Sequence, residues 1–166
     1  MSLKSSTTKK KKKEIPFIAK RLMKELVRIE KSNLEGIRVF PSKTDTFFWL
    51  AMIDGPPETP YEDGHFQISI RFSDEYPIRP PSVQFLDIPF HPNIYKDGKI
   101  CVDILQNEWS PAMNVEKILI SIRSLLMDPN INSPANRDAS KLFKENYSEY
   151  CKRVRNKINS EVGRKK

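Results

Sequence analysis

The stretch HFQISIRF, residues 65–72, is the clearest indicator of the fold in this sequence. Its apolar side chains occupy every second position, at Phe66, Ile68, Ile70 and Phe72. Successive side chains of a β-strand point to opposite faces, so this alternation predicts a strand with one face on a core and the other in polar surroundings. Half-buried strands of this kind are typical of antiparallel sheets.

Three further runs rich in β-branched and aromatic residues flank this stretch. They are IRVFP at 37–41, FFWLAMI at 47–53 and SVQFLD at 82–87. Turn signals separate the runs, such as DGPP at 54–57 and PP at 80–81. Because short connections join consecutive strands, the four runs predict an antiparallel meander.

Helical patterns lie on both sides of the predicted sheet. Before it, Pro16 suits the first turn of a helix, and apolar residues then recur at helical spacing, which predicts a helix over residues 16–31. After it, Asn114 suits an N-cap, and the run VEKILISIRSLLMD that follows predicts a largely buried helix. Residues 137–162 then predict two amphipathic helices that break near Asn146.

This order of elements predicts an α+β fold, with an N-terminal helix, a four-stranded antiparallel meander, an irregular connection over residues 88–113 and three further helices. A chain of 166 residues suits one domain with a sizeable core. We expect a disordered lysine-rich extension over residues 1–14, a folded domain over 15–162 and a basic tail over 163–166.

The formal charge of +8 is unevenly distributed along the chain. Residues 1–13 carry six lysines and no acidic residue, and residues 164–166 are all basic, which leaves the rest of the chain almost neutral. The lysine run could serve as a nuclear-import signal, an anionic-surface contact or a solubilising arm. This distribution argues against nucleic acid as a partner of the folded domain.

The composition also limits the compartment and the cofactors. The sequence has no apolar run of 18 residues, no secretion signal and no Met-Gly start, so we expect a soluble protein with no membrane partner. Cys101 and Cys151 are too few for a disulfide scaffold, and neither has the neighbours of a zinc site. We therefore expect reduced thiols, no metal, and a cytoplasmic or nuclear location.

The connection over 88–113 concentrates the reactive side chains, and long irregular connections in compact domains are usually functional. Within it, Cys101 and Asp103 alternate with three aliphatic residues, which places the thiol on the polar side of an extended segment. Three chemistries compete here: a Cys–His hydrolase with His91 as base, a metal site, and a thioester carrier that lacks an efficient base. The metal site fails because too few ligands are present.

Five motifs, in this order, resemble those of the ubiquitin-conjugating enzymes. They are GPPETPYEDG at 55–64, YPIRPP at 76–81, HPN at 91–93, ICVDIL at 100–105 and WSP at 109–111. The strings QNEWSP, SIRSLL and NSPAN are most similar to the branch involved in DNA repair and N-terminal recognition. The resemblance implies the ubiquitin-conjugating (UBC) fold, and an enzyme that accepts ubiquitin from the activating enzyme as a thioester and transfers it to substrate lysine with a ubiquitin ligase.

The resemblance also implies roles for single residues. Cys101 would be the thioester-forming nucleophile, Asn93 would hold the active-site loop and stabilise the oxyanion, and Asp103 would orient or deprotonate the incoming lysine. His91 would organise the loop rather than act as a base. The loop and gate around the thiol would also include Pro92, Tyr95, Asn130 and Ser133, the last of which replaces an Asp found in many relatives.

Other matched positions imply docking surfaces. Those expected to bind the activating enzyme and, in part, ligases are Lys20, Arg21 and Lys24. Those expected to pack on RING or HECT ligases are Ile78, Ser110, Pro111 and Ala112. Those expected to contact donor ubiquitin are Ile120 and Ser124. No cofactor is implied for this domain, because ATP is used by the activating enzyme.

Two alternatives remain open at this point. The chain could carry a related modifier such as NEDD8, or it could be a ubiquitin-binding scaffold, although scaffold variants lose the cysteine that this chain keeps.

Overall fold

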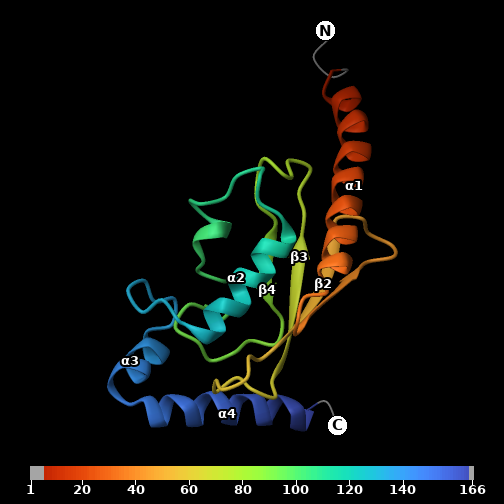
Figure 1. Ribbon diagram of the computed structural model, residues 1–166. Coiled ribbons are helices and arrows are strands. Elements are labelled where there is room, and N and C mark those ends of the chain that lie inside the picture. The colour runs from red at the N-terminus through yellow and green to blue at the C-terminus, as the bar shows by residue number, and fades with distance from the viewer. Residues whose placement is uncertain (1–5, 165–166) are drawn as a thin grey trace.

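A four-stranded antiparallel sheet forms the centre of the fold, and its strands follow one another in chain order (Figure 1). The strands are β1 (Ile37–Pro41), β2 (Phe48–Asp54), β3 (His65–Arg71) and β4 (Ser82–Phe85). On β3 the side chains of Phe66, Ile68 and Ile70 are buried, while those between them are not. The predicted meander and the predicted inward face of this strand are therefore confirmed.

The computed structural model describes residues 6–164 of the chain, and the side chains of residues 16–161. Helix α1 spans Ser6–Ser32, so it begins well before the predicted start at Pro16. Residues 6–14 are thus helical where the sequence favoured disorder, while residues 1–5 and 165–166 of the predicted basic ends lie outside the described part. Lysine is a good helix former, and a helix already nucleated by its packed part extends without a new nucleus.

Three further helices follow the sheet, as predicted: α2 (Val115–Met127), α3 (Arg137–Glu145) and α4 (Tyr147–Arg164). Helix α2 begins at the predicted cap, where the Asn114 side chain accepts the N–H of Lys117 at 2.9 Å. Helices α3 and α4 are separated at Asn146. Buried side chains of all four helices and of the strands form one core, and Figure 1 shows α3 and α4 at the end of the molecule away from the start of α1.

Between β4 and α2 the chain contains little regular structure, apart from a short 3-10 turn, η1 (Asp103–Leu105). Within residues 6–164, no helix is long and apolar enough to cross a membrane.

Candidate active site

A tight turn built on Gly98 folds the connection between β4 and α2 back on itself. Gly98 has a φ of 90°, and a side-chain carbon there would lie 2.1 Å from the carbonyl oxygen of Phe85. Only glycine tolerates both conditions. Across the turn the N–H of Tyr95 donates to the carbonyl of Lys99 at 2.9 Å. The predicted gate residue Tyr95 therefore lies at this turn, and its side chain is exposed.

Cys101 follows this turn, and its free thiol is partly exposed. The backbone N–H of Cys101 donates to the carbonyl of Asn93 at 2.8 Å, which holds the HPN tripeptide beside the thiol residue. Ile100 and Val102, on either side, are buried in the core. The predicted alternation is therefore confirmed as far as exposed Asp103, where η1 begins. Burial of both neighbours anchors the segment and leaves the thiol on its outer side.

His91 is fully buried, and both of its ring nitrogens are occupied. Its Nδ1 accepts the N–H of Asn93 at 2.9 Å, so Nε2 carries the proton and donates to the carbonyl of Leu125 at 2.6 Å. Leu125 lies in the last turn of α2, where carbonyls have no partner within the helix. Burial lowers the pKa of His91 to about 4, and the hydrogen bond to Leu125 only partly opposes this. A neutral ring without a free nitrogen cannot serve Cys101 as a base, which removes the hydrolase alternative.

The low pKa of His91 predicts a loss of stability on mild acidification. Folding lowers the pKa of His91 from 6.5 to about 4, so between these pH values the unfolded state binds a proton that the folded state does not. The contribution of the neutral His91 ring to the free energy of unfolding is therefore fully present above pH 6.5 and is lost as the pH falls toward 4. The full contribution is about 3 kcal/mol. We expect urea unfolding between about pH 7 and pH 5 to show this slope in wild type and not in His91→Gln.

The other histidine of the chain supplies the control, since His65 is exposed and bonded to Asp54. His65→Gln should keep the slope. An unchanged slope in His91→Gln would contradict the assignment of this acid sensitivity to the buried ring.

Asn93 is also fully buried, and its side-chain amide joins the active-site loop to the segment after α2. Its Oδ1 accepts the N–H of Asn130 at 2.8 Å, while its Nδ2 donates to the carbonyls of Asn130 at 2.6 Å and Ser133 at 3.4 Å. The carbonyl of Pro92 accepts two further N–H groups, from residues 135 and 136, at 2.8 and 3.0 Å. The structure thus brings the predicted gate residues Asn130 and Ser133 together around Asn93.

Both N–H groups of the Asn93 amide are used in this arrangement. An oxyanion at the thioester would therefore have to displace a carbonyl from this amide. The Ser133 contact at 3.4 Å is the longer of the two and the easier to exchange.

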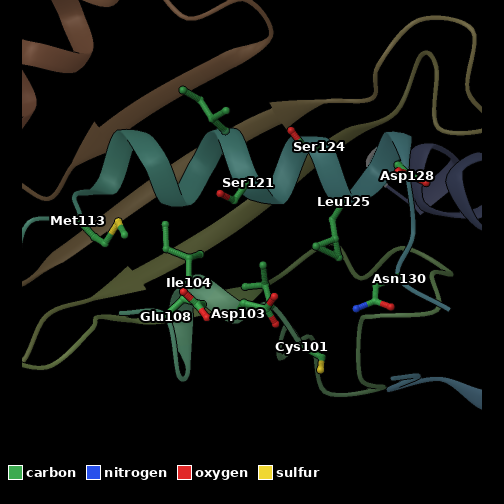
Figure 2. Close-up of a pocket in the computed structure, with 12 residues that line it drawn as sticks. Cys101, Asp103, Ile104, Glu108, Met113, Ser121, Ser124, Leu125, Asp128 and Asn130 are labelled. Atoms are coloured by element: carbon green, nitrogen blue, oxygen red, sulfur yellow. The ribbon is translucent and has the colours of Figure 1, made fainter. Parts of the chain in front are cut away.

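A groove of about 470 Å³ runs from Cys101 along α2 (Figure 2). Ile120 and Ser124, the predicted contacts of donor ubiquitin, line this groove together with Cys101. The groove is open, and its walls include aliphatic side chains such as Ile104 and Leu125. This shape suits an extended peptide chain that ends at the thiol.

Three groove residues carry carboxylates: Asp103, Glu108 and Asp128. Asp103 was expected at the site, whereas Glu108 and Asp128 were not. Asp128 follows Ser124 by four residues, and this helical spacing was a signal that could have placed Asp128 on the same face as Ser124. Glu108 had no comparable signal, because it lies in an irregular segment.

The predicted ligase-docking residues lie in two neighbouring loops. Ile78 is 76% exposed, and Pro111 and Ala112 are exposed beside half-buried Ser110. The indole N–H of Trp109 donates to the carbonyl of Pro77 at 3.0 Å and joins the two loops.

On α1, the predicted docking residues differ in exposure. Lys20 and Lys24 are exposed, whereas Arg21 is half buried and its guanidinium is bonded within the protein. Among the described residues, no group of three or more His, Cys, Asp and Glu side chains could hold a metal ion.

Comparison with known proteins agrees with this geometry. A family model described as ubiquitin-conjugating enzyme matches residues 21–158. The chain is 47% identical to ubiquitin-conjugating enzyme E2 2 of Debaryomyces hansenii over 139 residues, which cover 84% of this chain and 83% of that protein. It is 50% identical to ubiquitin-conjugating enzyme E2 1 of Caenorhabditis elegans over 135 residues, which cover 81% of this chain and 70% of that protein.

Proposed function

Because the chain belongs to the ubiquitin-conjugating enzyme family, whose members are transferases, we propose that Cys101 is the residue that carries ubiquitin. Members of this family work with ubiquitin, an activating enzyme and ligases. The observation that supports Cys101 is its partly exposed thiol at the end of an open groove, between two buried neighbours. Cys151 is also partly exposed, but it lies in α4, packs against the core and does not line this groove.

The proposed reaction has two acyl transfers. In the first, the Cys101 thiolate attacks the thioester carbonyl that joins ubiquitin to the activating enzyme, and the thiolate of that enzyme leaves. In the second, the neutral amine of a substrate lysine attacks the new thioester, an isopeptide bond forms, and the Cys101 thiolate leaves.

The incoming lysine must lose a proton before it attacks. An ordinary lysine pKa of about 10.4 makes the neutral amine cost about 4.6 kcal/mol at pH 7. Desolvation at the groove lowers that pKa, and the carboxylate of Asp103 at the groove orients the amine and accepts its proton. Asp103 is exposed, so it can be reached by a lysine from outside.

The thioester must also survive until a lysine arrives. A free base beside the sulfur would activate water and hydrolyse it. His91 has no free nitrogen, so it cannot act as such a base at Cys101, which favours a carrier over a hydrolase. Asn93 stabilises the oxyanion by giving up its longer bond to the Ser133 carbonyl, while Pro92, Tyr95 and Asn130 hold the loop.

The exposed predicted surfaces complete the proposal. Lys20 and Lys24 on α1 receive the activating enzyme, and the groove residues Ile120 and Ser124 hold donor ubiquitin. The loops with Ile78 and 110–112 receive a RING or HECT ligase. The substrate is a lysine of a protein, and neither a membrane nor a nucleic acid is a partner. The reaction takes place in the cytoplasm or the nucleus. Residues 15–162 form the catalytic domain.

The alternative that a related modifier is the cargo can be tested directly. We expect ubiquitin, presented with its own activating enzyme, to form a thiol-labile adduct, and each related modifier with its own activating enzyme to form none. The adduct should be followed on non-reducing gels and by mass spectrometry.

Deletion of residues 1–13 serves as the control, because the proposed carrier does not depend on the lysine run and should still be loaded. Preferential loading of another modifier would replace ubiquitin as the cargo. Loss of function on deletion, with thioester loading left intact, would favour a function driven by the basic extension.

A further inference from the structure

Arg21 and Glu25, one turn apart on α1, form an ion pair that reaches two other parts of the chain. The Nε of Arg21 donates to Oε1 of Glu25 at 2.9 Å. The Nη2 of Arg21 donates to the carbonyls of Pro111 and Met113 at 3.0 and 2.8 Å. The guanidinium thus binds the loop that carries the predicted ligase contacts, although these residues are about ninety positions away in the sequence.

Glu25 is only 6% exposed, and its carboxylate accepts three hydrogen bonds. One comes from Arg21, and one comes from the N–H of Val115 at 2.8 Å, the first residue of α2. The third comes from the hydroxyl of Tyr76. A carboxylate at a helix N-terminus also complements the helix dipole. Glu25 therefore joins α1, the start of α2 and the loop that carries Ile78.

The second loop is held by the same pair. Tyr76 lies just before Ile78, and burial, followed by the bond to Glu25, raises the pKa of Tyr76 above its ordinary value, so its hydroxyl remains a donor. The Arg21 guanidinium lies over the Tyr76 ring, 5.7 Å from its centre. Trp109 joins the two loops directly, because its indole N–H donates to the carbonyl of Pro77.

The opposite charges of Arg21 and Glu25 are thus paired inside the protein, and the exposed residues of the two loops remain available to a partner. Ile78, Pro111 and Ala112 are exposed, while the groups that hold their loops are buried or half buried. No strand pairing joins the two loops, and these side-chain bonds link both of them to α1. When the spacing of two loops is set before a partner binds, less ordering of the loops is needed on binding, which favours affinity.

We propose that Arg21 and Glu25 are positioning residues that preorganise the two loops for ligase docking, and that Arg21 is not a direct contact for the activating enzyme. The inference rests on the proposed function of these loops. It separates Arg21 from exposed Lys20 and Lys24 on the same helix, with which sequence similarity had grouped it.

The test measures lysine discharge from preloaded conjugate while the concentration of a RING domain is raised, using a domain chosen because it accelerates wild type. In Arg21→Ala we expect a rise of about tenfold in the RING concentration needed for half of the maximal stimulation, equal to about 1.4 kcal/mol. Loading by the activating enzyme, discharge without RING domain, and the rate at saturating RING domain should stay within about twofold of wild type. Amide exchange at Met113 should be faster.

Arg28→Ala is the matched control, because Arg28 also joins α1 to α2, through Glu116 at 2.7 Å, but has no bond to either loop. It should leave the RING concentration unchanged. Arg21→Lys should lie between wild type and Arg21→Ala, since an ammonium keeps the charge but not the fork that binds Glu25 and two carbonyls at once.

Three results would overturn the inference. Reduced loading with an unchanged RING concentration would make Arg21 a contact for the activating enzyme. Equal losses in every step, together with a lower Tm in both Arg21 variants, would mean general stability only. No change in any step would remove the role altogether. Failure of wild type itself to load on Cys101 is a separate result, which would overturn the proposed function.

Discussion

Replacement of Cys101 by alanine is expected to abolish loading with ubiquitin completely. The reaction needs a thiolate at the end of the groove, and the other residues that line the groove offer no second thiol. Loss of the nucleophile therefore leaves nothing to accept the acyl group, while the fold should persist because the thiol is partly exposed and makes no disulfide. The measurement is the adduct on non-reducing gels after incubation with the activating enzyme, ATP and ubiquitin.

Two further variants make this prediction specific. Cys101→Ser should form an oxyester that resists thiol reagents, because a hydroxyl oxygen replaces the sulfur in the same position. Cys151→Ser should load as wild type does, since Cys151 lies in α4 and is packed against the core. A reducible adduct that persists in Cys101→Ser but not in the double variant would show that Cys151 is the acceptor.

Replacement of Asn93 by serine is expected to slow lysine discharge by about 10²–10³-fold, the usual effect of losing one oxyanion donor. Serine cannot reach both Asn130 and Ser133, so the amide that bridges the two segments is lost as well. Loading by the activating enzyme should remain, because the thiol and the groove are unchanged. Single-turnover discharge to free lysine measures the effect without a ligase.

Asn130→Ala is the matched control for this variant. Asn130 meets Asn93 only through its backbone N–H and carbonyl, which alanine retains, while its side chain accepts the N–H of Asn132. Asn130→Ala should therefore discharge within about tenfold of wild type. Equal rates for Asn93→Ser and wild type would remove the oxyanion role, and equal slowing in both variants would assign the effect to the loop rather than to the amide.

Much of the fold could be predicted from local patterns. The alternation in residues 65–72, the cap at Asn114 and the break at Asn146 each depend on neighbours within a few positions, and each is confirmed. The predicted start of α1 at Pro16 was wrong, because the helix extends toward the N-terminus from a nucleus in its packed part after Pro16.

The candidate site also contains features that the sequence predicted and features that it missed. Motif spacing brought Cys101 and the HPN tripeptide into one loop, and the structure places them in contact. Glu108 and Asp128 were missed because the groove that they line exists only once α2 packs beside that loop.

The sequence by itself determined the order of helices and strands, the family, and the exposure of Cys101, since these follow from periodicity, turn residues and motifs that are local. Only the tertiary structure decided that His91 has no free nitrogen, that the Asn93 amide is already occupied, and that Arg21 is turned inward. Their partners, Leu125, Asn130 and Pro111, lie 34, 37 and 90 positions away. A polar side chain acquires its role from the groups that burial forces it to bond, and those groups are defined only after the chain has folded.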